Sequence, residues 1–97
     1  MSTSEYRAAR DTLLRLRDDR AGALEAFQWP DVGRRFNWAI DWFDAIARGN
    51  DRPALVVVSN DGTRDERSFD ELARRSDQVA EWLRSLGVQK GDAVLLM

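Results

Sequence analysis

The stretch that decides the fold is residues 68–97, "SFDELARRSDQVAEWLRSLGVQKGDAVLLM". Ser68 and Glu71 have the S-x-x-E spacing of a capping box, which predicts that a helix begins here. Apolar residues at helical spacing extend this helix over about 69–86, and Gly87 is placed to end it in a left-handed conformation. A glycine-containing turn then leads into a final apolar run, which predicts a strand.

A β-hairpin is predicted immediately before this helix. The segment "PALVVVS" (53–59) has the continuous apolar character of a buried strand, and "NDG" (60–62) is typical of a turn in which Gly62 takes a positive φ. The segment "TRDER" (63–67) is polar on both faces and fits a strand at a sheet edge. Strand, helix and final strand would form a right-handed βαβ unit, whose parallel strand is normally covered on both faces.

The N-terminal third is predicted to be helical. Ser4 is a candidate N-cap for a helix over about 5–18, and a short helical turn is expected through Leu24 and Phe27. The first helix would bury one apolar stripe, formed by Tyr6, Ala9, Leu13 and Leu16.

Another helix is predicted over about 38–48, with Asn37 as its N-cap and Gly49 just beyond its end. Its expected buried stripe consists of Phe36, Ile40, Phe43 and Ala47. Trp38 and Trp42 lie on a second apolar line beside it. Burial in a core is the favoured interpretation of this pair, with contact to a partner helix and stacking on a base as the alternatives.

The composition excludes several classes of function. The 97 residues carry 15 basic and 17 acidic side chains, a net charge of -2, and no basic face, so nucleic-acid binding is not expected. The chain has no cysteine, which excludes disulfides and thiolate chemistry and gives no sign of an oxidising compartment. No apolar run approaches the roughly 20 residues that span a bilayer, so we expect a cytoplasmic protein with no membrane span.

The residues that could carry chemistry are few, because histidine and cysteine are both absent. Two aspartate pairs, Asp18 with Asp19 and Asp41 with Asp44, could bind a cation or act as acid and base, but their positions favour solvated surface groups. Lys90 lies between a helix and a strand, the reverse of the order in a phosphate-binding turn. We therefore assign no catalytic, cofactor-binding or metal-binding residue.

Two motifs in one register resemble the opening of the adenylate-forming superfamily, which includes acyl-CoA synthetases, luciferases and adenylation domains of peptide synthetases. The first matches at Ser68, Phe69, Glu71 and Leu72, and the second, "L-G-V-x-x-G-D-x-V", at Leu86, Gly87, Val88, Gly91, Asp92 and Val94. Upstream, residues 36–41 and 53–55 are similar to the "FN-x-A-x-D" and "P-A-L" elements of AMP-forming acyl-CoA synthetases. The "FQWP" at 27–30 is most similar to the medium-chain fatty acid branch.

This resemblance implies a longer parent enzyme that activates a fatty acid with ATP and Mg²⁺ to an acyl-adenylate and transfers the acyl group to coenzyme A. In that family the phosphate loop, the Mg-ATP glutamate, the ribose-binding aspartate and the catalytic lysine lie downstream, without counterparts in this sequence. We therefore expect residues 1–97 to be an inactive N-terminal fragment. It would be a single partial α/β domain, with a helical extension over 1–35 and the start of the enzyme's N-terminal domain over 36–97.

The alternative is a stand-alone α/β interaction module. Such a module would use the face of Trp38 and Trp42, or an open sheet edge, to bind a partner or a second copy of itself. In either case we expect self-association, because an uncovered apolar strand and a broad apolar helix require covering surfaces.

Overall fold

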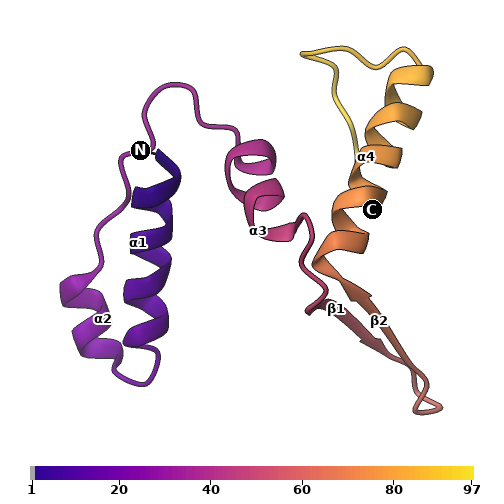
Figure 1. The fold of residues 1–97 in the computed structure, drawn as a ribbon. Coiled ribbons are helices and arrows are strands. Elements are labelled where there is room, and N and C mark those ends of the chain that lie inside the picture. The colour runs from indigo at the N-terminus through magenta and orange to yellow at the C-terminus, as the bar shows by residue number, and fades with distance from the viewer. Residues whose placement is uncertain (1) are drawn as a thin grey trace. The chain divides into compact units, whose positions relative to one another are not determined.

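The computed structural model describes residues 2–97, and the chain divides into two compact units with the boundary between Ala45 and Ile46. In chain order the elements are α1 (Ser2–Arg15), α2 (Arg20–Ala26), the π-helix η1 (Trp38–Asp44), α3 (Ala45–Ala47), β1 (Pro53–Val58), β2 (Arg64–Ser68) and α4 (Phe69–Ser85) (Figure 1). Helices with a two-stranded sheet agree with the predicted α/β class. The predicted division of the chain at 35/36 stays a prediction.

The first helix begins earlier than predicted. α1 starts at Ser2, so Ser4 lies inside its first turn and the N-cap prediction for Ser4 was wrong. The N–H groups in the first turn of a helix have no intrahelical acceptors. Small polar residues are therefore tolerated there, and the helix can begin before Ser4. After α1, the side chain of Asp19 accepts a hydrogen bond from Gly22 N–H at 2.9 Å and caps α2.

Asn37 caps the next helix as predicted, since its Oδ1 accepts hydrogen bonds from Ala39 and Ile40 N–H at 3.0 and 3.3 Å. The helix that follows is a π-helix, which the sequence did not predict. Its i→i+5 hydrogen bonds widen each turn and shift which side chains share a face. Ile40, predicted to be buried, is therefore 63% exposed, whereas Trp42 is only 5% exposed. The core interpretation is confirmed for Trp42 and was wrong for Trp38, which is 52% exposed.

The hairpin of the second unit forms as predicted. β1 and β2 pair antiparallel with Val56 opposite Glu66, and Gly62 takes a φ of 86° in the turn. The prediction that β1 is buried was wrong, because Val57 and Val58 are 51% and 63% exposed. The reason is that α4 is the only helix among residues 2–97 with several contacts to this sheet, and one helix does not cover a strand on both faces.

Both ends of α4 agree with the sequence. Glu71 N–H donates to Ser68 Oγ at 3.1 Å and Ser68 N–H donates to the Glu71 carboxylate at 2.7 Å, which completes the capping box. At the other end Gly87 has a φ of 82°. Val88 N–H donates to the Leu83 carbonyl at 3.2 Å, the signature of a Schellman motif.

The final strand of the predicted βαβ unit is absent from the described structure. The turn before it forms, with Asp92 N–H donating to the Gln89 carbonyl at 3.0 Å, but residues 93–97 pair with no strand. A strand requires a neighbour to satisfy its backbone groups, and none lies beside this segment within residues 2–97. Leu95 and Leu96 are accordingly 82% and 95% exposed.

The capping box predicts the effect of Ser68→Ala. The substitution leaves Glu71 N–H without its acceptor, so the free energy of unfolding should fall by about 1 kcal/mol, as for other N-cap serines. Urea unfolding followed by far-UV circular dichroism measures this change. Ser76→Ala, at an exposed position in the middle of the same helix, is the control and should be neutral or slightly stabilising. Equal stability of the two variants would contradict the prediction.

Candidate functional site

The core of the first unit is an aromatic cluster around Trp42. The ring of Tyr6, on α1, lies 4.7 Å from the Trp42 ring, and the guanidinium carbons of Arg7 and Arg10 lie 5.3 and 5.1 Å from its centroid. These separations are those of cation–π contacts. Tyr6 Oη also accepts a hydrogen bond from Trp38 Nε1 at 3.1 Å. The buried indole is therefore held by one aromatic ring and two guanidinium groups of helix α1.

A cavity of about 320 Å³ lies beside this cluster. It is lined by Tyr6, Ala9, Arg10, Leu13, Phe27, Trp29, Pro30 and Trp42. Its volume is at the lower end of the range for small-molecule sites. Arg10 is the only charged lining residue, and its Nη2 lies 2.6 Å from Asp11 Oδ1, so its charge is already compensated. The cavity is thus an apolar hollow without a nucleophile or a general base.

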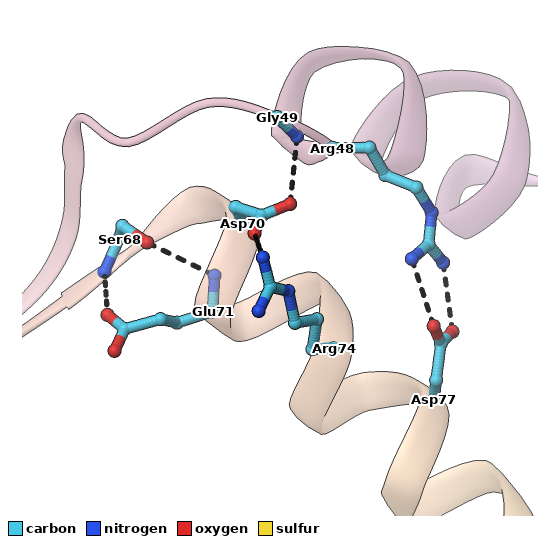
Figure 2. Close-up of polar contacts among 7 residues, drawn as sticks. All are labelled: Arg48, Gly49, Ser68, Asp70, Glu71, Arg74 and Asp77. Atoms are coloured by element: carbon cyan, nitrogen blue, oxygen red, sulfur yellow. Dashed lines mark hydrogen bonds and ion pairs between the residues drawn. The ribbon is translucent and has the colours of Figure 1, made fainter.

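The second unit has a polar cluster that joins Arg48 and Gly49 to α4 (Figure 2). Asp70 Oδ1 accepts a hydrogen bond from Gly49 N–H at 2.8 Å, and Asp70 Oδ2 lies 2.5 Å from Arg74 Nη2. About two turns beyond Asp70, the two terminal guanidinium nitrogens of Arg48 donate to the two carboxylate oxygens of Asp77, each at 2.9 Å. This bidentate geometry is the most directional form of a carboxylate–guanidinium pair.

The electrostatics of this cluster are those of structural contacts. The hydrogen bond from Gly49 N–H lowers the pKa of Asp70, with Arg74 contributing. The Arg48 side chain lowers the pKa of Asp77, and the backbone N–H of Ser68 lowers the pKa of Glu71. Each carboxylate is therefore held in its ionised, hydrogen-bond-accepting form. None has the raised pKa that would suit a general acid.

One aspartate of each pair considered as a site makes a local backbone contact. Asp41 Oδ2 accepts from Asn37 N–H at 2.7 Å, and Asp19 caps α2. Asp18 lies 3.6 Å from Arg17 on the surface, and Lys90 lies exposed in the turn after α4. Within residues 2–97 the structure brings together no group of three His, Cys, Asp or Glu side chains that could hold a metal ion.

The sequence did not predict the contacts that organise either unit. Arg48 and Asp77 are 29 residues apart, and the arginines over Trp42 belong to another helix. Periodicity identifies which face of one helix is apolar, but carries no signal for a pair of charged residues on two elements.

Comparison with known proteins identifies the family to which this chain belongs. The AMP-binding enzyme family matches residues 42–97, more than half of the chain and all of its second unit. A curated relative, 4-hydroxybutyrate–CoA ligase 1 of Metallosphaera sedula, is 39% identical over 67 residues. The alignment covers 66% of this chain and 12% of that ligase. No solved structure matches, and no helix within residues 2–97 is long and apolar enough to cross a membrane.

The polar cluster predicts a loss of stability in acid. Because the pKa of Asp70 is lowered by folding, its ionised form contributes stability above the ordinary aspartate value of about 3.9, and that contribution is lost as the pH falls through the folded-state pKa. Asp70→Asn should therefore lose less stability than the unchanged chain between about pH 5 and pH 2. Urea midpoints measured across this range test the difference. Asp51→Asn, an exposed neighbour, controls for net charge, and an unchanged slope in Asp70→Asn would refute the assignment.

Proposed function

Because this chain belongs to the AMP-binding enzyme family, we propose that it is the N-terminal part of an adenylate-forming acyl-CoA ligase. The observation that carries the proposal is the family match over residues 42–97, which contains the capping box at Ser68 and the Schellman motif at Gly87. The relative with a CoA-ligase name supports the same class of reaction. The chain spans 12% of that relative, so the activity belongs to a longer parent enzyme.

In the proposed reaction, a carboxylate oxygen of the acid attacks the α-phosphorus of ATP and pyrophosphate leaves. The thiol of coenzyme A then attacks the acyl carbonyl and AMP leaves. The residues described here do not fit a site for ATP or Mg²⁺. Asp70 and Asp77 bind Arg74, Arg48 and the Gly49 N–H, and no group of candidate metal ligands is present among residues 2–97. Residues 1–97 would therefore support the fold of the parent enzyme while its remaining chain supplies the chemistry.

We propose a fatty acid as substrate, and the "FQWP" segment at 27–30 favours a medium chain. The name of the ligase relative points instead to 4-hydroxybutyrate, a short hydroxy acid. The two acids differ in length and polarity, so activity assays with a panel of acids distinguish between the two substrate assignments. A cytoplasmic location completes the proposal and is motivated by the absence of cysteine.

An activity assay on the protein encoded by the complete reading frame tests this proposal. With ATP, Mg²⁺ and coenzyme A, we expect acid-dependent release of AMP and pyrophosphate and formation of an acyl-CoA, with octanoate preferred over 4-hydroxybutyrate. The isolated 97 residues should form no product. Preference for 4-hydroxybutyrate would overturn the fatty-acid assignment, and no AMP release with any acid of the panel would overturn the ligase assignment.

The exposed apolar surface favours a second candidate, an interaction module that self-associates. On the face of Trp38 and Trp42, only Trp38 offers apolar surface, since it is 52% exposed whereas Trp42 is 5% exposed and packs on Tyr6. The open sheet edge remains, since Val57 and Val58 of β1 are more than half exposed.

For the isolated chain we propose self-association through this uncovered surface. Light scattering of the purified 97 residues should give a mass that rises with concentration above that of one copy. A Val58→Lys variant should shift the equilibrium toward the monomer, whereas Arg64→Lys, on the opposite strand, should not. A monomer at every concentration would contradict the proposal, and a defined dimer of a natural 97-residue protein would favour the module over the ligase fragment.

A further inference from the structure

Strand β1 has the side chains of a central strand but the surroundings of an edge strand. Its residues Leu55, Val56, Val57 and Val58 are all apolar, so both faces of the strand carry branched aliphatic side chains. All four are between 38% and 63% exposed. A continuous apolar run of this kind is typical of a strand covered on both faces by other layers.

The hairpin register identifies the backbone groups that β1 leaves open. Ser59 N–H donates to the Thr63 carbonyl at 2.9 Å, which makes this a hydrogen-bonded pair. Bonded and non-bonded pairs alternate along an antiparallel ladder, so Val57, opposite Asp65, is also bonded to β2. Val56 and Val58 then direct their N–H and C=O groups away from β2, toward the open edge of β1.

The two edges of the hairpin differ in chemistry. β2 carries four consecutive charged residues, 64–67, joined in ion pairs: Arg64 to Glu66 at 2.6 Å and Arg67 to Asp65 at 2.8 Å. Charged side chains of this kind protect an edge from further pairing. β1 carries no charge. The uncharged β1 edge therefore favours pairing with another strand, whereas the charged β2 edge disfavours it.

We propose that the open edge of β1 receives a strand from the part of the ligase chain that follows residue 97, and that β1 becomes an internal strand of a larger sheet. This inference rests on the proposed function. The chain covers 12% of its ligase relative, which leaves ample chain to provide both a strand and covering layers. A second copy pairing edge to edge would satisfy Val56 and Val58 but would only extend the sheet, leaving the apolar faces of β1 open.

The exposed surface of α4 also favours a later part of the same chain as the partner of the β1 edge. Val79, Trp82 and Leu86 follow one another at helical spacings of three and four residues and are 50%, 59% and 62% exposed. This apolar line requires a covering layer in addition to a strand, and a continuing chain supplies both. Residues 93–97 pair with no strand in the structure and so leave the β1 edge open.

Proline substitutions in the full-length parent test the proposal, because proline removes one N–H and is tolerated in a strand only where that N–H is unpaired. If a later strand binds the edge, Val56→Pro should lower the apparent melting temperature by at least about 3 °C relative to Val56→Ala, which controls for the lost side chain. Val57→Pro, which removes a bond to β2, is the positive control and should be destabilising. Equal apparent melting temperatures of Val56→Pro and Val56→Ala would overturn the proposal.

Hydrogen exchange identifies the occupant. In the full-length protein the amides of Val56 and Val58 should exchange as slowly as that of Val57, at every protein concentration. Exchange at the intrinsic rate of an unprotected amide would overturn the proposal. So would protection that is lost on dilution, which would assign the edge to a second copy. Protection in the 97-residue chain at concentrations where it is monomeric would assign the edge to residues 93–97 and also overturn it.

Failure of this inference and failure of the proposed function are separable. If the full-length protein releases AMP but Val56→Pro and Val56→Ala have equal apparent melting temperatures, the ligase assignment stands and the added strand at the β1 edge is rejected. If the full-length protein has no ligase activity but Val56→Pro is less stable than Val56→Ala, the ligase assignment is rejected and the added strand at the β1 edge stands.

Discussion

The hydrogen bond from Gly49 N–H to the Asp70 carboxylate is the contact on which the second unit depends. It joins the chain after α3 to the first turn of α4, and Asp70 N–H returns a bond to the Asn50 carbonyl at 2.9 Å. The strands of the hairpin begin and end within a few residues of this junction. A carboxylate in the first turn of a helix also interacts favourably with the helix dipole. The position of α4 on the hairpin therefore follows from one local junction, with the Arg48–Asp77 pair adding a second attachment about two helical turns further on.

The sequence predicted the elements whose determinants are local. The capping box at Ser68, the left-handed Gly87 and the turn at Gly62 are each decided within about six residues, and all three are confirmed. The exposed β1 was wrongly predicted to be buried, because burial depends on which layers lie nearby and an apolar run does not contain that information. The predicted final strand is absent for the same reason, since pairing requires a partner.

The π-helix η1 shows a different limit. Its cap at Asn37 was predicted, but a pattern analysed at 3.6 residues per turn placed Ile40 inside, whereas the wider turn places Trp42 there. The candidate sites divide in the same way. The rejection of the aspartate pairs as a metal site stays a prediction, while the apolar cavity beside Trp42 combines side chains from well-separated segments and has no local signature.

The fluorescence of the tryptophans reports how the regions around them are packed. Three of the four are more than half exposed, and Trp82 is the only one that lies in the second unit. An indole in water emits at longer wavelength than one in an apolar layer. The emission of Trp82 should therefore shift to the blue when another part of a longer chain covers α4. The helix that packs on the hairpin thus carries a fluorophore on its exposed face.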